Sequence, residues 1–170
     1  MRTNKIRINL KASMALLMAM LLTPVAGATG IDLHWLWDDR CAECHGHSGN
    51  FARLFLNVSG GELQGRHHVY DLHRFMHNHY LLESEVDAVY DMLLAQASSQ
   101  ARFRQVCSSC HGTAVNFVRS SLELRDGLLF SRKYGRPVYS FLDNHMGLSP
   151  DDVEFFTKQL TRVAHEVYRP

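Results

Sequence analysis

Two stretches of the chain place apolar residues at helical spacing on one face. One begins at Ser84 and the other at Ser149, where Ser-Pro-Asp-Asp offers an N-cap, a proline at the first helical position and acids in the first turn. The apolar positions are Val86, Val89, Tyr90, Leu93 and Leu94 in the first stretch, and Val153, Phe156, Leu160 and Val163 in the second. Such stripes predict two amphipathic helices whose apolar faces pack into a core.

Shorter elements precede each of these helices in the same order. Alternating apolar residues around Gly-Gly and Asp-Gly predict two β-hairpins, over 54–63 and 121–130. Four further short helices are expected, over 32–44, 72–79, 100–110 and 138–145. The predicted fold class is therefore mainly α, with a short hairpin in each half of the chain.

The N-terminal segment has a different pattern. Its basic residues, with no acid among them, are Arg2, Lys5, Arg7 and Lys11. An apolar run from Ala12 to Leu22 follows, and then the small residues Ala26-Gly27-Ala28. This order is typical of a secretory signal peptide over 1–28, whereas an uncleaved membrane anchor, the alternative, needs about 20 apolar residues. We therefore expect an exported, periplasmic protein with no stable membrane span after signal cleavage.

Composition and charge exclude several classes of protein. With 46% hydrophobic and 21% charged residues, the 170-residue chain is neither a disordered tail nor a polytopic membrane protein. Its 18 Lys and Arg balance 17 Asp and Glu, so no basic excess indicates nucleic-acid binding. Removal of residues 1–28 leaves 14 basic against 17 acidic residues, a net charge of −3.

All four cysteines fall in two copies of one motif. The copies are Cys41-Ala-Glu-Cys44-His45 and Cys107-Ser-Ser-Cys110-His111. C-x-x-C-H is the attachment signature of c-type haem. Two thiols at this spacing lie on one side of a helix end, where they can bond the two vinyl groups of one porphyrin, and the adjacent histidine is delivered to the iron. A zinc site, a thioredoxin-like redox pair and plain disulfides are the alternatives, but none explains a histidine after both pairs.

The two motifs belong to an internal repeat of 66 residues. Across residues 41–79, 14 of 39 positions are identical to their counterparts 66 residues later, without a gap. After a one-residue slip, Val86 aligns with Val153 and Leu93 with Leu160. We interpret the chain as a duplicated haem domain, with the first copy over 29–97 and the second over 98–170.

With its two C-x-x-C-H-G segments and the helical stretch after each, the chain resembles the c-type cytochromes, specifically a dihaem form with two class I-like cytochrome c domains in tandem. The resemblance implies two covalently attached haem c groups and electron transfer. The residues it implies for thioether attachment are Cys41, Cys44, Cys107 and Cys110, and those for proximal ligation of iron are His45 and His111.

The repeat also narrows the choice of the second axial ligand of each iron. His79 and His145 occupy equivalent positions, each after an asparagine and each before the closing helix. Met76 and Met146 are alternatives, since methionine is a common sixth ligand, but neither has a methionine at its equivalent position in the other repeat. In the first repeat, further alternatives are His67, His68, His73 and His77. We therefore expect bis-histidine ligation by His79 and His145.

Several other residues are weaker candidates for contacts with haem. Repeated arginines that could pair with haem propionates are Arg66 and Arg132, and equally Arg53 and Arg119. Asn78 and Asn144 are candidates for orienting the ligand histidines, or for forming a turn. Aromatic residues expected to pack towards the porphyrin edge, or into the core, are Trp35, Trp37 and Phe103.

These features together predict an exported dihaem electron carrier that passes single electrons between redox partner proteins and is not itself a catalyst. The alternative is a haem enzyme or the electron-transfer subunit of a larger oxidoreductase, of peroxidase-like type, with one open iron. A haem-based gas sensor would also need an open iron. The sequence does not identify the redox partners.

Overall fold

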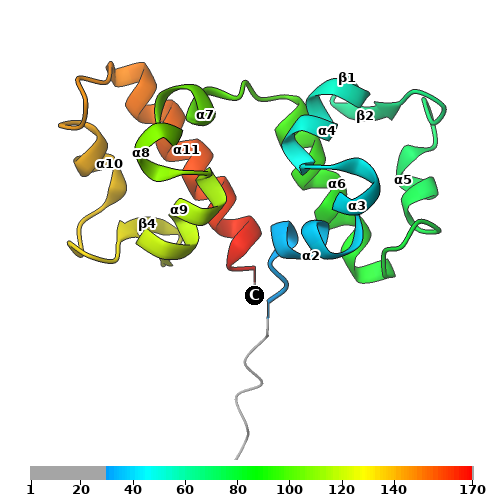
Figure 1. The fold of residues 1–170 in the computed structure, drawn as a ribbon, viewed down its shortest axis with the longest axis horizontal. Coiled ribbons are helices and arrows are strands. Elements are labelled where there is room, and N and C mark those ends of the chain that lie inside the picture. The colour runs from blue at the N-terminus through cyan, green and yellow to red at the C-terminus, as the bar shows by residue number, and fades with distance from the viewer. Residues whose placement is uncertain (1–29, 170) are drawn as a thin grey trace, which may run out of the picture.

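The structure, a computed structural model, describes residues 30–169. It is mainly α with two short antiparallel hairpins, which confirms the predicted secondary-structure class. Two halves lie side by side and are joined by a short connection through residues 98–101 (Figure 1). None of the helices between residues 30 and 169 combines the length and apolar character needed to cross a membrane. The predicted signal peptide lies outside the described residues.

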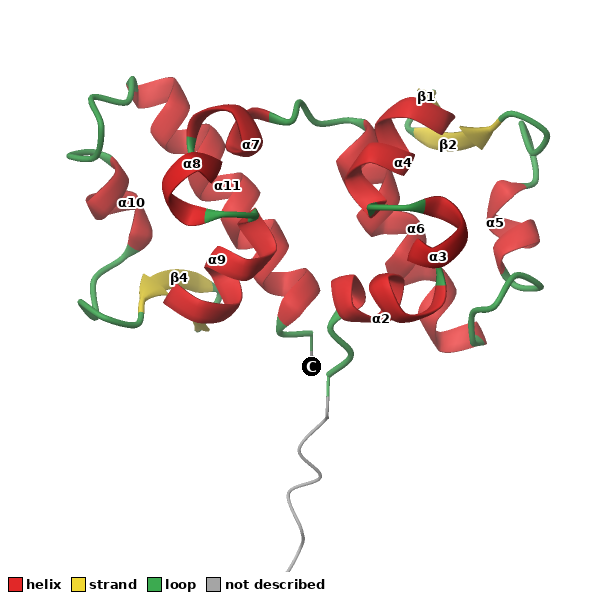
Figure 2. Cartoon of the chain, in the orientation of Figure 1, coloured by secondary structure: helices red, strands yellow, loops and turns green. Residues whose placement is uncertain are grey.

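Both halves contain the same kinds of element in the same order (Figure 2). The first half contains α2 (Leu33–Arg40), α3 (Ala42–His45), α4 (Ser48–Phe55), β1 (Leu56–Ser59), β2 (Glu62–Gly65), α5 (Leu72–Met76) and α6 (Glu83–Ala97). The second contains α7 (Arg102–Val106), α8 (Ser108–His111), α9 (Ala114–Ser121), β3 (Leu122–Arg125), β4 (Leu128–Ser131), α10 (Val138–Leu142) and α11 (Pro150–Val167). The repeated sequence therefore folds into a repeated structure.

Both hairpins turn at the Gly-Gly and Asp-Gly pairs, as the sequence predicts. The central turn residues, Gly60 and Gly61 in one hairpin and Asp126 and Gly127 in the other, all have positive φ, as a two-residue hairpin turn of type I′ requires. β1 begins at Leu56 rather than at the expected position 54, because the preceding residues complete the last turn of α4.

The two closing helices also match the prediction in their buried faces. The Oγ of Ser149 caps α11 by accepting the N–H of Asp152 at 3.2 Å, and Pro150 is the first helical residue. α6 begins at Glu83, one residue before the expected Ser84, where the Glu85 carboxylate accepts the Leu82 N–H at 2.8 Å. The predicted apolar stripes are buried, apart from the half-buried Tyr90 and Leu94.

The opening helices are shorter than the predicted ranges of 32–44 and 100–110. Each is interrupted at the first cysteine of its motif, so that the rest of the motif forms a separate turn, α3 or α8. Both turns end at a glycine with positive φ, 66° at Gly46 and 68° at Gly112. Because glycine adopts this conformation without a steric penalty, the helix stops immediately after the motif histidine.

Buried apolar side chains form two separate clusters, one in each half. The first joins the stripe of α6 to Leu33, Leu36 and Trp37 of α2. The second joins the stripe of α11 to Phe103 of α7 and Val118 of α9. Each half therefore has its own core, although neither core is large.

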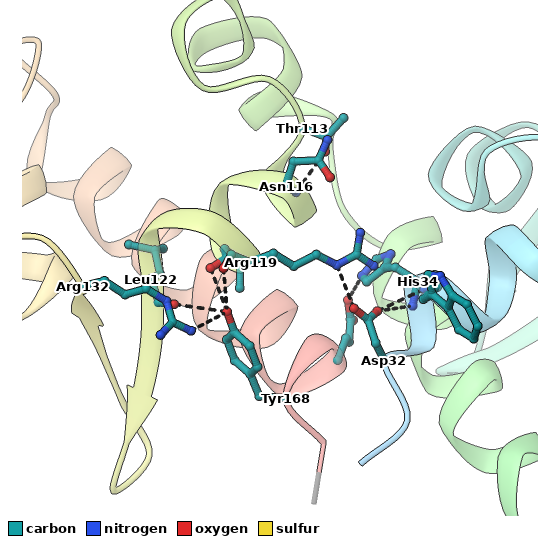
Figure 3. Close-up of polar contacts among 11 residues, drawn as sticks. Asp32, His34, Thr113, Asn116, Arg119, Leu122, Arg132 and Tyr168 are labelled. Atoms are coloured by element: carbon teal, nitrogen blue, oxygen red, sulfur yellow. Dashed lines mark hydrogen bonds and ion pairs between the residues drawn. The ribbon is translucent and has the colours of Figure 1, made fainter. Parts of the chain in front are cut away.

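The halves meet through polar contacts between α2 and the second half (Figure 3). His34 Nε2 lies 2.8 Å from the Oε2 of Glu166, and both side chains are buried. Arg119 Nε donates to the Oδ2 of Asp32 at 2.7 Å. The N-terminal helix of one half is thus tied to α9 and α11 of the other.

Candidate functional site

Each C-x-x-C-H motif closes a single helical turn that brings its thiols and its imidazole together. The N–H of His45 donates to the carbonyl of Cys41 at 2.9 Å, and that of His111 to the carbonyl of Cys107 at 3.0 Å. All four cysteines are free: Cys41 and Cys107 are half-buried, whereas Cys44 and Cys110 are exposed. No disulfide therefore competes for these thiols.

The histidines expected to be axial ligands face each other in both halves. The ring centroids of His45 and His79 lie 5.9 Å apart, and those of His111 and His145 lie 6.0 Å apart. Two metal–nitrogen bonds of about 2 Å, together with the distance of roughly 1 Å from each nitrogen to its ring centre, separate two imidazoles on one metal by about 6 Å. Both gaps therefore have the width that one metal between two histidines requires.

The alternative methionine ligands are placed differently from the histidines. Met76 is only 6% exposed and belongs to the hydrophobic core of the first half. Met146 borders a cavity beside His145, but it is 66% exposed and lies next to the histidine in a left-handed turn with φ of 60°. The two methionines thus occupy unlike environments, whereas the two histidine pairs are alike.

Phenylalanines flank the histidines in the same way in both halves. Phe51 lies 4.5 Å from His45 and Phe117 lies 4.4 Å from His111, between ring centroids. On the other side of the gap, the centroid distances are 4.6 Å for Phe75 and His79 and 4.9 Å for Phe141 and His145. Each histidine is therefore packed against an aromatic ring that limits its rotation.

The second gap opens into a cavity of about 590 Å³, within the range of roughly 300–1,000 Å³ typical of ligand and cofactor sites. The cavity is lined mainly by apolar side chains from α7 to α11, with His111 and His145 on its wall. Arg132 and Lys133 are the cationic side chains that border it among the described residues. A large apolar group with acidic substituents fits this mixture of surfaces.

Burial sets the charge state of several groups at the two motifs. It lowers the pKa of His45, and the nearby His79 lowers it further by charge repulsion, so that the imidazole is held in the neutral form that binds metals. Burial raises the pKa of the Cys41 thiol, and likewise that of the Cys107 thiol. Both thiols are therefore protonated at neutral pH and less reactive than an exposed cysteine.

The repeated arginines divide between the cavity and the interface of the halves. Arg132 borders the cavity and donates to the Tyr168 hydroxyl at 3.0 Å (Figure 3). Arg119 instead pairs with Asp32, and Arg53 donates to the carbonyl of Gln96 at 3.4 Å. Arg66 is exposed beside the first hairpin. Of the four candidates for propionate partners, Arg132 therefore has the best placement.

Other candidates have purely structural contacts. Trp37 is buried and donates its Nε1–H to the carbonyl of Gly46 at 2.8 Å, and Phe103 is buried at the cavity wall. Trp35 is 66% exposed, so it does not pack into the core, and its packing towards a porphyrin stays a prediction. Asn78 and Asn144 donate their backbone N–H groups within turns, to Phe75 and Phe141.

Three further histidines of the first half pair with acids. The pairs are His68 with Asp71, His73 with Asp87 and His77 with Glu83. Between residues 30 and 169, no group of three or more His, Cys, Asp or Glu side chains has the arrangement to hold a metal ion. These histidines lie on a solvated face, as their ion pairs indicate.

Tyr168 is a structural residue that sequence reasoning missed. Its hydroxyl lies 2.9 Å from the carbonyl oxygen of Val118 and 3.2 Å from that of Leu122, and it also accepts from Arg132 (Figure 3). It therefore links the end of α11 to α9, to the hairpin and to the arginine at the cavity. No periodic pattern marks this residue, because it follows the last turn of the helix.

Comparison of the chain with protein-family models, with curated proteins and with solved structures found no match.

Proposed function

We propose that the protein is an exported dihaem c-type cytochrome that carries single electrons between redox partner proteins. The observation that carries this proposal is the repeated juxtaposition of a C-x-x-C-H turn and a second histidine at about 6 Å, 5.9 Å in one half and 6.0 Å in the other. The same separation in both halves is the one that a pair of axial ligands requires. The tandem class I-like cytochrome c fold is part of the same proposal.

The roles of the residues follow from their positions. A bound haem supplies a one-electron ferric–ferrous couple. Cys41 and Cys44 would hold the first haem by thioethers, with His45 and His79 as its axial ligands. Cys107 and Cys110 would hold the second, with His111 and His145 as axial ligands. The wall of the cavity is mainly apolar, and Arg132 is placed to pair with a carboxylate there.

Two facing histidines favour electron transfer over the alternative functions. A peroxidase-like enzyme or a gas sensor needs an iron with an open sixth position. Because His79 and His145 occupy the same place opposite the motif histidines, both irons would be closed to small molecules. Bis-histidine ligation also predicts lower reduction potentials than His/Met ligation, because the thioether favours ferrous iron more strongly.

Replacement of either distal histidine tests the proposal most directly. In the purified mature protein we expect intact mass and retention of pigment after acid–acetone extraction to report two covalently attached haems. Near-infrared magnetic circular dichroism should report two bis-histidine irons, and the reduced protein should not bind carbon monoxide. His79→Ala and His145→Ala should each convert one haem to a high-spin form that binds carbon monoxide.

Two control variants separate ligation from general damage. His77→Ala removes a histidine that lies two residues before His79 and pairs with Glu83. Met146→Leu removes the alternative ligand beside His145. Both should leave two low-spin irons. An unchanged spectrum in His145→Ala, or a new high-spin iron in Met146→Leu, would show that the histidine assignment in the second half is wrong. A colourless mature protein would overturn the function itself.

A further inference from the structure

A second cavity lies in the cleft between the two halves and is separate from the histidine pairs. Its volume is about 470 Å³, and both halves contribute to its lining. The first half presents α2 and the N-terminal turn of α4, and the second presents α7, the N-terminal turn of α9 and one face of α11. We call this cavity the interdomain cleft.

The interdomain cleft concentrates positive charge. Arg53 from the first half and Arg104 and Arg162 from the second line it, together with His34 and His47. No acidic side chain lines it among residues 30–169. Arg53, Arg104 and Arg162 line the same cavity, and in keeping with this the pKa of Arg53 is lowered by burial and further by the charges of Arg104 and Arg162.

Charges within the protein do not balance this cluster. Arg162 pairs with Glu166, but the same carboxylate also faces His34 at 2.8 Å. Arg104 contacts only a neutral group across the cleft, the Oδ1 of Asn50 at 3.4 Å, among the contacts of the described residues. Arg53 likewise donates to a carbonyl. Among the contacts of the described residues, only Arg162 of the three arginines therefore has a carboxylate partner.

Further groups in the cleft suit an anion. The N-termini of α4 and α9, both helices of 8 residues, carry partial positive charge and border it.

We propose that the interdomain cleft binds a small multivalent oxyanion of the phosphate or sulfate type. Guanidinium groups suit such anions because their planar N–H donors match two oxygens at once. Since Arg53 comes from one half and Arg104 and Arg162 from the other, the anion would also hold the two halves together. This proposal does not depend on the haem assignment.

Calorimetric titration of the mature protein with inorganic phosphate and with sulfate, at constant ionic strength adjusted with chloride, tests the site. We expect saturable binding of at least one of these anions, and the tighter one identifies the class of ligand. Arg104→Gln should weaken binding by about tenfold or more, as expected for the loss of a charge-assisted hydrogen bond. Arg74→Gln, an identical change at an exposed position on α5, should leave binding within about twofold.

Thermal unfolding gives a second test, because adding the anion should reverse which of the two proteins unfolds at the higher temperature. In chloride alone, Arg104→Gln should unfold at the same temperature as the original protein or higher, because it removes charge repulsion in the cleft. With saturating phosphate or sulfate the order should reverse, because the original protein gains more from the anion. Equal anion affinity in Arg104→Gln and Arg74→Gln, or the absence of saturable binding of both anions, would overturn the proposal.

Discussion

Tyr80 and Met146 are the residues directly after His79 and His145, and both have a left-handed backbone, with φ of 59° and 60°. This conformation costs a residue other than glycine about 1–2 kcal/mol. It recurs at equivalent positions although the side chains differ, and both side chains are exposed. The turn geometry therefore imposes it: each histidine can face the gap only if the chain turns sharply immediately afterwards.

Met146→Gly should relieve this strain. We expect the free energy of unfolding to rise by up to about 1 kcal/mol, reduced somewhat by the freedom that glycine adds to the unfolded chain. With the proposed bis-histidine ligation, the second haem should stay low-spin in this variant, because Met146 would not be its ligand. Urea denaturation followed by circular dichroism measures the change, with Met146→Leu as the control that keeps the strain. A loss of stability in Met146→Gly would show that the thioether has a packing role.

At the scale of elements, α11 connects the helix signal in the sequence to the wall of the cavity beside His111 and His145. Its start is specified by Ser149 and Pro150, and this start determines which residues form its buried face. Phe156 and Leu160 of that face line the cavity, while Val153 and Val163 pack in the core. The cap thus affects both the stability of the helix and the shape of the site.

Ser149→Ala should lower the free energy of unfolding by about 1 kcal/mol, because the N–H of Asp152 loses its acceptor. The same change at Ser140, which is exposed on α10, should have an effect below about 0.5 kcal/mol. Chemical denaturation of both variants measures the difference. If the two variants were equally stable, the capping bond would contribute nothing to the fold.

At the scale of the whole molecule, a few polar contacts set how the two cores are arranged. His34 and Glu166 form a buried pair, and Asp32 has two roles, since its Oδ1 caps α2 and its Oδ2 accepts from Arg119 across the interface. Burial alone would raise the pKa of Asp32, but the hydrogen bond from Arg119, the Trp35 N–H and the charge of Arg119 together lower it below its ordinary value. The docked arrangement therefore favours the ionised carboxylate.

This linkage predicts a loss of stability in acid. Because the folded pKa of Asp32 is depressed, its contribution is complete above the ordinary carboxyl pKa of about 4 and disappears as the pH falls through the lower folded value. Asp32→Asn keeps an N-cap but removes the charge, so it should cost about 0.5–1 kcal/mol at pH 7 and less below pH 4. Unfolding measured from pH 7 to pH 3 compares the two proteins. A cost that stays constant over this range would show that the ion pair contributes nothing.

Much of the fold could be predicted because the relevant signals are local or repeated. The stripe of α11 and its Ser-Pro start need only neighbouring residues, and the Asp-Gly turn of the second hairpin needs only two. The equivalence of His79 and His145, one in each half, came from the alignment of the repeats. Arg53, Arg119 and Trp35 could not be placed in this way, since an arginine or a tryptophan serves equally well at a cofactor, at an interface or on the surface.

The sequence by itself determined the chemistry that the chain can offer: two C-x-x-C-H motifs, an internal repeat, and the order of helices and hairpins, because all of these depend on residue identity and short-range spacing. The tertiary structure alone decided that Met76 belongs to a core and that Arg53, Arg104 and Arg162 converge from different halves. Those features arise from contacts between residues far apart in the chain, and long-range packing leaves no periodic trace in the sequence.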